Sequence, residues 1–153
     1  EIGVRLVGSE MCIRDRSNLI RKNGITIIDD CYNANPVSMT ASIDVLSQAK
    51  GRKIAVLGDM GELGSEEKKL HGMVGTHFAG KKIDALFVTG TLAGEIAEEA
   101  RRVAPETKVY AEPDKEALEE ALLEYRRPGD TILVKASHFM GFSEIVKKLE
   151  QPQ

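Results

Sequence analysis

The sequence has few cysteines, no long hydrophobic run and no excess of basic charge, and each absence excludes a class of protein. Two cysteines, Cys12 and Cys31, give no framework of paired spacings, so we expect a reduced, cytoplasmic setting. No apolar run approaches the roughly 20 residues of a membrane-spanning helix, and no signal peptide is recognisable. The net charge of -3, with acids and bases interspersed, argues against a nucleic-acid surface. With 153 residues, the chain has the length of one domain.

Short β-branched apolar runs alternate with longer helical segments from Ile25 onward. The predicted strands are Ile25–Ile28, Lys53–Gly58, Asp84–Gly90, Thr107–Ala111 and Thr131–Ala136. The predicted helices are Val37–Ala49, Glu66–Ala79, Leu92–Val103, Lys115–Tyr125 and Phe139–Glu150. Runs that are apolar throughout are typical of strands buried on both faces. The alternation predicts βαβ units and a mostly parallel sheet.

A further short strand is predicted at Asn18–Arg21, before a tight turn at Lys22–Gly24. It would pair antiparallel at the edge of the sheet. The fold class is therefore α/β: a three-layer, Rossmann-like arrangement with a mostly parallel sheet of about six strands, one antiparallel edge strand and helices on both faces. Asp114 is predicted to cap the helix that begins at Lys115.

The candidate site lies in the polar loops that follow the strands, because open α/β sheets bind ligands beyond the carboxyl ends of their strands. The first loop reads "DDCYNANPVSM" (residues 29–39). Asp29 and Asp30 end a buried strand, where carboxylates need partners. Asn33 and Asn35 add amide groups ahead of a helix N-terminus that can bind an anion. The run favours a ligand site; the alternative is that Asp29 and Asn35 only brace and cap the turn.

Two more loops complete this candidate site. "GDMGELGSEE" (residues 58–67) holds Asp59, Met60 and Glu62 between glycines that permit positive φ and close approach of a ligand. The alternative is an ordinary loop in which Ser65 caps the next helix. "KASHFMG" (residues 135–141) contributes a lysine, a serine and a histidine. The lysine can bind a carboxylate or phosphate, or form a structural salt bridge with an aspartate of the other loops (Asp29, Asp30 or Asp59).

Two histidines and one cysteine are interpreted as structural or surface residues. His71 and His77 are six residues apart in one predicted helix, a spacing that does not put metal ligands on one face. Cys31 has no general base nearby in the sequence, which favours a packed thiol over a nucleophile.

Five blocks of the sequence resemble the C-terminal domain of the Mur ligases, which are ATP-dependent enzymes of peptidoglycan synthesis. They are "IIDDCYNANPVSMTASIDVL", "IAVLGDMGELG", "LHGMVG", "IDALFVTG" and "ILVKASHFMG", and they occur in family order between Leu19 and Leu149. "DDCYNANP" with "GDMGELG" is similar to the member that joins D-alanyl-D-alanine to UDP-N-acetylmuramoyl-tripeptide. The resemblance implies a peptide ligation through an acyl phosphate, with ATP and Mg2+ as cofactors of the full-length enzyme, and a monomer.

The signature G-x-x-x-x-G-K-[ST], which cradles the phosphates of ATP, is absent from the sequence. The resemblance implies an enzyme of three domains with this signature in the central one, so we expect residues 17–153 to be the third domain. Its partners would be the missing N-terminal and central domains together with the two substrates and ATP. The fragment is expected to hold no cofactor and no metal by itself and to be inactive alone.

Position by position, the resemblance assigns two groups of residues. Those that face the nucleotide are Asp30, Asn33, Asn35 and Arg16. Those that hold the substrates are Tyr32, Asp59, Met60, Glu62, Lys135, Ser137 and His138. No residue of this chain is assigned a catalytic role.

Residues 1–16 carry a different signal. Met11–Asp15 and the first bases of the next codon back-translate to ATG TGT ATA AGA GAC AG, which resembles the transposase mosaic end used in sequencing libraries. The adapter arm that precedes this mosaic end reads Leu-Val-Gly-Ser-Glu in the same frame, as Leu6–Glu10 does. We expect residues 1–16 to be adapter-derived. Cys12 is then not a natural cysteine, and the codon of Arg16 is partly adapter sequence.

Two other classes of protein fit part of the pattern. A phosphoacceptor receiver domain also has an acid pair, an aspartate, a hydroxyl and a lysine after successive strands, as in Asp29, Asp30, Asp59, Thr89 and Lys135. However, Asp59 follows Asp30 too closely to leave room for the extra strand and helix of a receiver. A generic nucleotide-binding module is the second alternative.

Overall fold

The computed structural model describes residues 18–31 and 34–152 of the chain. Its centre is a six-stranded sheet in the order β1-β2-β6-β3-β4-β5, in which only the β1–β2 pair among the pairings described is antiparallel. The strands are β1 (Asn18–Lys22), β2 (Ile25–Asp30), β3 (Lys53–Leu57), β4 (Ala85–Thr89), β5 (Lys108–Glu112) and β6 (Thr131–Lys135). This arrangement confirms the predicted α/β class and the antiparallel edge strand.

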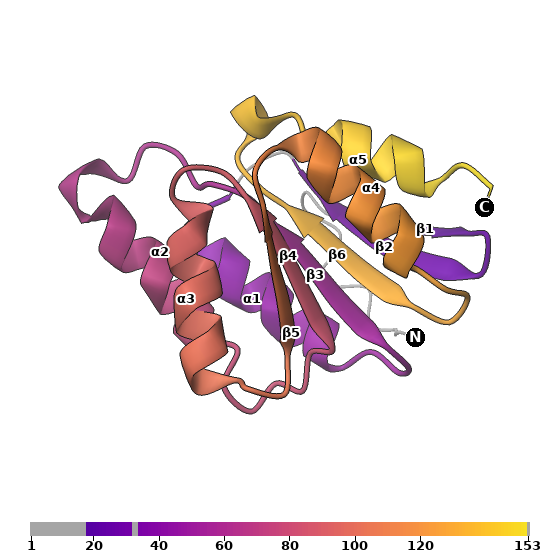
Figure 1. Cartoon of the computed structure of the whole chain (residues 1–153), viewed down its shortest axis with the longest axis horizontal. Helices are drawn as coiled ribbons and strands as arrows, with labels where there is room; N and C mark the ends of the chain where they lie inside the picture. The colour runs from indigo at the N-terminus through magenta and orange to yellow at the C-terminus, as the bar shows by residue number, and fades with distance from the viewer. Residues whose placement is uncertain (1–17, 32–33, 153) are drawn as a thin grey trace.

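Five α-helices and two 3-10 turns lie between and after the strands in the described part of the chain (Figure 1). The α-helices are α1 (Pro36–Ser47), α2 (Glu67–Thr76), α3 (Ala93–Val103), α4 (Lys115–Tyr125) and α5 (Ser143–Leu149). The 3-10 turns are η1 (Gly64–Glu66) and η2 (His138–Met140). No helix within residues 18–31 and 34–152 combines the length and the apolar character that crossing a membrane requires.

Two hydrophobic clusters, one on each face of the sheet, hold the three layers together. The first joins α1, α2 and α3 to the sheet through side chains such as Ile43, Val74 and Ile96. The second joins α4 and α5 to the opposite face through side chains such as Leu122 and Ile145. Figure 1 shows these two groups of helices on opposite sides of the sheet. The central strands are therefore buried on both faces, as their continuous apolar runs predict.

Short-range signals in the sequence explain where several elements begin and turn. The β1–β2 hairpin turns at Asn23 and Gly24, whose φ angles are 56° and 81°. Positive φ at both residues is the geometry of a two-residue hairpin turn, for which Asn-Gly is the preferred pair. Asp114 caps α4 as predicted, because its side chain accepts a hydrogen bond of 2.8 Å from the backbone N–H of Ala117.

Three predictions about the elements were wrong. The predicted helix Phe139–Glu150 is split, because Gly141 adopts a left-handed conformation (φ 68°) between η2 and α5. Ser65 does not cap a helix, since neither η1 nor α2 has a side-chain cap. The run at residues 107–111 is not buried on both faces: β5 is the last strand of the sheet, and its residues are exposed or half-buried.

Candidate functional site

The polar loops singled out in the sequence meet at one edge of the sheet. The parallel register pairs Asp30 at the end of β2 with Lys135 at the end of β6, and Lys135 in turn with Leu57 of β3. Because parallel strands end on the same side, the loops after β2, β3 and β6 are neighbours there. We call this side of the molecule the carboxyl edge.

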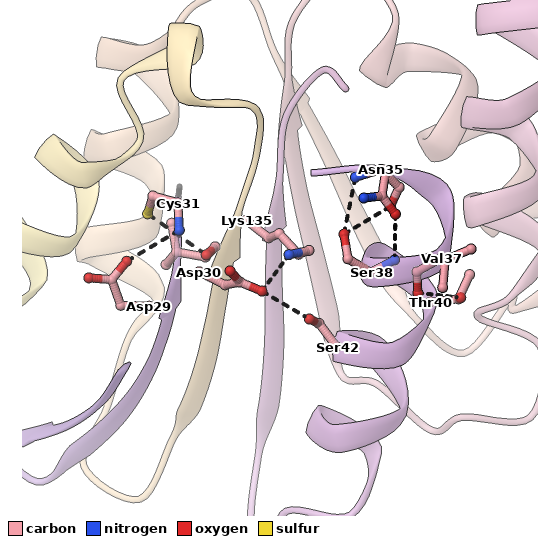
Figure 2. Close-up of polar contacts among 10 residues, drawn as sticks. Asp29, Asp30, Cys31, Asn35, Val37, Ser38, Thr40, Ser42 and Lys135 are labelled. Carbon is pink, nitrogen blue, oxygen red and sulfur yellow. Dashed lines mark hydrogen bonds and ion pairs between the residues drawn. The ribbon is translucent and has the colours of Figure 1, made fainter. Parts of the chain in front are cut away.

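Asp30 and Lys135 form a buried ion pair at the centre of the carboxyl edge. The ammonium of Lys135 donates to Oδ2 of Asp30, and the side chains are almost fully buried, with residue exposures of 6% for Asp30 and 1% for Lys135. The same oxygen accepts a hydrogen bond of 3.3 Å from Ser42 of α1 (Figure 2). The pair neutralises two charges that would be costly to bury singly. Two roles were considered for Lys135, ligand binding and a structural salt bridge. The structure shows the salt bridge, with Asp30.

The neighbours of this pair are packed rather than reactive. Oδ1 of Asp29 lies 3.4 Å from the backbone nitrogen of Cys31, which donates to it, and the Cys31 thiol faces the carbonyl oxygen of Val134 at 3.8 Å. Burial raises the pKa of the Cys31 thiol far above its ordinary value, and the carboxylates of Asp29 and Asp30 raise it further. A thiol of this kind stays protonated at neutral pH, in agreement with the predicted packed cysteine.

Asn35 caps α1 through a reciprocal pair of hydrogen bonds with Ser38. Its Oδ1 accepts from the Ser38 N–H at 2.8 Å, and its own N–H donates to the Ser38 hydroxyl at 3.1 Å (Figure 2). This is a capping box in which serine takes the place usually held by Glu or Gln. Pro36 follows in the first turn, where its lack of an N–H has no cost. The capping alternative for Asn35 is therefore realised in the structure.

The loop from Gly58 to Gly64 is held in place by its own backbone amides. The N–H of Gly58 donates to the carbonyl of Lys135 at 3.1 Å. The N–H of Met60 donates to Nε2 of His71 at 2.9 Å, and that of Gly61 donates to the hydroxyl of Ser137 at 2.6 Å. These three amides are already used within the chain, so they do not form a cradle for phosphate.

The glycines of this loop serve packing within the protein. A Cβ atom at Gly58 would lie 2.7 Å from Phe142 and 2.9 Å from Ala136. A Cβ atom at Gly61 would lie 2.9 Å from Phe139. At these two glycines the close neighbours in the structure are side chains of the β6–α5 connection, and the close approach of a ligand stays a prediction.

Asp59 binds the N-terminus of α3. Its Oδ1 accepts from the backbone N–H groups of Leu92 at 3.0 Å and Ala93 at 2.7 Å, which places a negative charge at the positive end of the helix dipole. Gly90, with φ at 128°, permits this approach, since a Cβ atom there would lie 2.4 Å from the carboxylate. Asp59 is buried, so it does not offer the open carboxylate of a receiver phosphoacceptor.

The remaining candidates differ in their access to solvent. Glu62 and His138 are exposed, whereas Met60 is buried among core side chains and Ser137 is buried while it binds Gly61. Phe139, beside Gly61, has an exposed fraction of 67%. Tyr32, Asn33 and Arg16 lie outside the described residues. Within residues 18–31 and 34–152, no group of three His, Cys, Asp or Glu side chains is arranged to hold a metal ion.

Three polar residues that hold the site were not assigned to it from the sequence, although His71 was interpreted as a structural or surface residue. Ser38 could have been found from its position three residues after Asn35, because that is the spacing of a capping box. Ser42 and His71 gave no such signal, since each contacts a partner set by the tertiary fold. His77 contacts Asp44 at 2.9 Å on the surface, in agreement with its interpretation as a surface residue.

The chain is similar to known proteins over most of its length. It is 41% identical over 137 residues to the UDP-N-acetylmuramoyl-tripeptide–D-alanyl-D-alanine ligase of Bacillus subtilis, an alignment that covers 88% of this chain and 30% of that enzyme. Its fold matches the crystal structure of the MurF ligase from Thermotoga maritima in complex with ADP, with a TM-score of 0.74 and 29% identity over 88% of this chain and 30% of that one. A MurF structure from Acinetobacter baumannii matches with a TM-score of 0.74 and 32% identity over the same shares.

The chain thus spans about 30% of the length of the curated relatives that it matches. The family model described as "Mur ligase, glutamate ligase domain" matches residues 15–138, which is most of the chain. This match decides against a receiver domain and against an unrelated nucleotide-binding module. Together with the doubly covered parallel sheet and the loops at its carboxyl edge, it establishes that the chain belongs to the Mur ligase family and carries that family's C-terminal domain.

Proposed function

We propose that this chain is the C-terminal domain of the ATP-dependent ligase that joins D-alanyl-D-alanine to UDP-N-acetylmuramoyl-tripeptide. The observation that carries the proposal is the 41% identity to the Bacillus subtilis enzyme of that name, which extends over 88% of this chain. The position of the matching motifs at one edge of the sheet supports it, because that edge is where an α/β domain binds ligands.

The described residues do not fit the phosphates of ATP or Mg2+. The amides of the Gly58–Gly64 loop are used internally, and the Lys135 ammonium is paired with Asp30. We therefore assign the phosphates and the metal to the central domain of the full-length enzyme. Asp30, Asn33 and Asn35 stay proposed contacts of the nucleoside part, where carboxylate and amide groups can bind hydroxyl groups. Arg16 is left out of this set, because its codon is partly adapter sequence.

The role proposed for this domain in the reaction is positioning. An incoming dipeptide must bring a neutral amine to the activated carboxyl group and keep it there, and holding two reactants together removes much of the entropic part of the barrier. The exposed carboxylate of Glu62 and the exposed ring of His138 suit contacts with a zwitterionic peptide. The other proposed substrate residues are Tyr32, Asp59, Met60, Lys135 and Ser137.

In this proposal Asp59, Met60, Lys135 and Ser137 act through the loops that they hold. Each of them is buried and has a contact partner within the chain, as described above. Substitution of these residues would displace Glu62 and His138. Substitution of Glu62 or His138 would instead remove a contact and leave the fold intact.

The domain proposal follows from the same comparison. We assign residues 17–153 to the Mur ligase domain and residues 1–16 to adapter-derived sequence; the family match begins two residues before this boundary, at residue 15. Amplification of the locus from genomic DNA tests it. A different codon sequence upstream of codon 17 is expected, and recovery of the same codons from intact DNA would contradict the assignment.

The proposed activity is tested by complementation. Residues 18–153 are fused to the first two domains of the Bacillus subtilis relative, and phosphate release is measured with ATP, UDP-N-acetylmuramoyl-tripeptide and D-alanyl-D-alanine. Release that depends on all three substrates is expected. A folded chimera that releases no phosphate would contradict the proposal. The 153-residue chain alone serves as the control and should show no turnover.

A further inference from the structure

His71 lies on α2, outside the segments that the proposed function uses, and its imidazole is fully buried. Its Nε2 lies 2.9 Å from the backbone nitrogen of Met60, and its Nδ1 lies 2.7 Å from the carbonyl oxygen of Glu67. An amide N–H can only donate and a carbonyl oxygen can only accept. The ring must therefore carry its proton on Nδ1 and keep a lone pair on Nε2. This bridge requires the neutral ring in one tautomer.

The Met60 amide is held together with its neighbours. The Gly58 amide donates to the carbonyl of Lys135 in β6, and the Gly61 amide donates to the Ser137 hydroxyl after β6. The Met60 amide between them donates to His71, which lies on α2. The backbone N–H of Ser137 also donates to the carbonyl of Asp59 at 3.0 Å. Residues 58–61 are thereby fixed by the β6 side and by α2, and the Asp59 side chain adds its contact with the N-terminus of α3.

Glu62 directly follows this segment, and its backbone is in an unfavourable conformation. Its φ angle is 59°, in the left-handed region that residues with a Cβ atom rarely adopt. Such a conformation persists only where the surrounding structure imposes it. The hydrogen bond from Met60 to His71 lies two residues before Glu62, so it is well placed to impose that conformation.

We propose that His71 is a positioning residue of the carboxyl edge. As the neutral Nδ1–H tautomer, it fixes the segment Asp59–Glu62 and thereby orients the exposed Glu62 carboxylate. The effect of His71 on a reaction rests on the proposed function. The hydrogen bond and its effect on the loop do not.

Two substitutions separate the two hydrogen bonds of the ring. In His71→Gln, the side-chain amide reaches the position of Nε2 and can still accept from Met60. In His71→Asn, the shorter amide reaches the position of Nδ1, so it can donate to Glu67 but leaves the Met60 N–H without its acceptor. The matched control is His77→Asn, which changes the partner of Asp44 on the surface near the end of the same helix.

The first readout is taken by NMR spectroscopy on the 15N-labelled 153-residue chain. We expect scalar coupling between the Met60 nitrogen and Nε2 of His71. We expect the Met60 amide to exchange with solvent about tenfold faster in His71→Asn, and to stay close to wild type in His71→Gln and His77→Asn. Protonated Nε2 in the wild-type chain, or unchanged Met60 exchange in His71→Asn, would overturn the proposal. If both variants at residue 71 fail to fold, the wild-type coupling and tautomer decide.

The second readout is the kinetics of the chimera. Because a misplaced loop weakens positioning of the incoming amine, His71→Asn should raise KM for D-alanyl-D-alanine by about tenfold or more, with a smaller change for the UDP-linked substrate. His71→Gln should keep the KM for D-alanyl-D-alanine close to the wild-type value. Equal losses for both substrates, in step with the loss of folded protein, would reduce His71 to a structural residue. A wild-type chimera without activity would count against the proposed function alone, while the Met60 exchange data would still test the hydrogen bond.

Discussion

At the scale of single residues, the carboxyl edge depends on one buried pair of opposite charges. Lys135 is the largest charged side chain among the described residues that are less than 2% exposed, and Asp30 shares one of its oxygens between Lys135 and Ser42. Removing one member of a buried pair leaves the other charge without compensation, which costs more than the pair itself contributes. Such a pair fixes the distance between β2 and β6 where the two loops begin.

The first prediction concerns this pair. Lys135→Met should lower the free energy of unfolding by about 3–5 kcal/mol, because Asp30 is then buried as a single charge. The double variant Asp30→Asn with Lys135→Met should lose less than Lys135→Met alone. Urea unfolding measures both, with Arg102→Met as the control, since Arg102 is exposed and pairs with the partly exposed Glu99 on the surface of α3. A double variant less stable than Lys135→Met would contradict this account.

The second prediction concerns Cys31. Its buried, protonated thiol should react with a disulfide reagent at pH 8 far more slowly in the folded chain than in denaturant, because the thiolate is the reactive form. The measurement uses a Cys12→Ser background so that only Cys31 reports. Equal rates with and without denaturant would show that Cys31 is accessible in the folded chain.

Residue types and their spacing allowed the contents of the site to be predicted, but not most of its contacts. Asp30 and Lys135 could be placed at one edge, since the position of each at the end of a predicted strand is visible in the sequence. That Asp59 would bind the N-terminus of α3 could not be predicted, because the contact joins residues 33 and 34 positions apart. Local patterns do not specify such pairs.

At the scale of elements, the helices pack closely where small residues allow it. Gly75 of α2 faces α3, and a Cβ atom there would lie 2.4 Å from the carbonyl oxygen of Ile96. The buried residues of α3 are also mostly small: Ala93, Ala97 and Ala100. Small residues on facing helices let the helix axes come closer together.

The third prediction compares two helical glycines. Gly75→Ala should lower the free energy of unfolding by about 1–3 kcal/mol, because the added methyl group forces α2 away from α3. Gly94→Ala in α3 meets open space and should raise the stability by about 0.5–1 kcal/mol, since alanine favours the helix. Thermal or urea unfolding of both variants gives the comparison. A stabilising Gly75→Ala would contradict the packing described for α2 and α3.

The fourth prediction concerns the contact between α1 and the end of α2. A hydrogen bond from Lys81 holds the pKa of Asp44 below its ordinary value, and His77 lowers it further. A carboxyl group whose pKa is lowered by folding contributes stability above its unfolded pKa, and this contribution is lost as the pH falls through the folded value. Asp44 is half exposed, so the effect should stay below about 1 kcal/mol.

The measurement is the difference in unfolding free energy between wild type and Asp44→Asn as a function of pH. We expect the wild type to be slightly more stable near neutral pH. The difference should shrink as the pH is lowered below the range in which an unfolded Asp titrates, about pH 4. A difference that grows towards acid pH would contradict the sign of the effect.

Element boundaries were predictable where a cap or a turn marks them. Asp114 fixed the start of α4, and Asn-Gly fixed the first hairpin, because both act through neighbouring residues. The break at Gly141 was not predicted, since a single glycine in an amphipathic run is compatible with a continuous helix. In the structure, the break lets α5 pack its apolar residues into the cluster on the α4 side of the sheet.

At the scale of the whole molecule, both hydrophobic clusters depend on the same strands. Neighbouring residues of β3 point to opposite faces: Ala55 and Leu57 belong to the cluster under α1, α2 and α3, whereas Ile54 and Val56 belong to the cluster under α4 and α5. A strand cannot leave one cluster without leaving the other. The two helical layers should therefore not unfold as separate units.

The fifth prediction is that the two layers share one unfolding transition. Amide hydrogen exchange is measured by NMR spectroscopy at increasing urea concentrations, for Ile43 in α1 and Val146 in α5. Because both side chains pack on one sheet, the two amides should converge on the same global free energy of unfolding. The control is the same measurement after deletion of residues 1–16, which should leave both values unchanged. Persistent protection in one layer after the other has lost it would show that the sheet does not couple the two layers. The site at the carboxyl edge would then depend mainly on the layer of α1 and α2, which supplies Ser42 and His71.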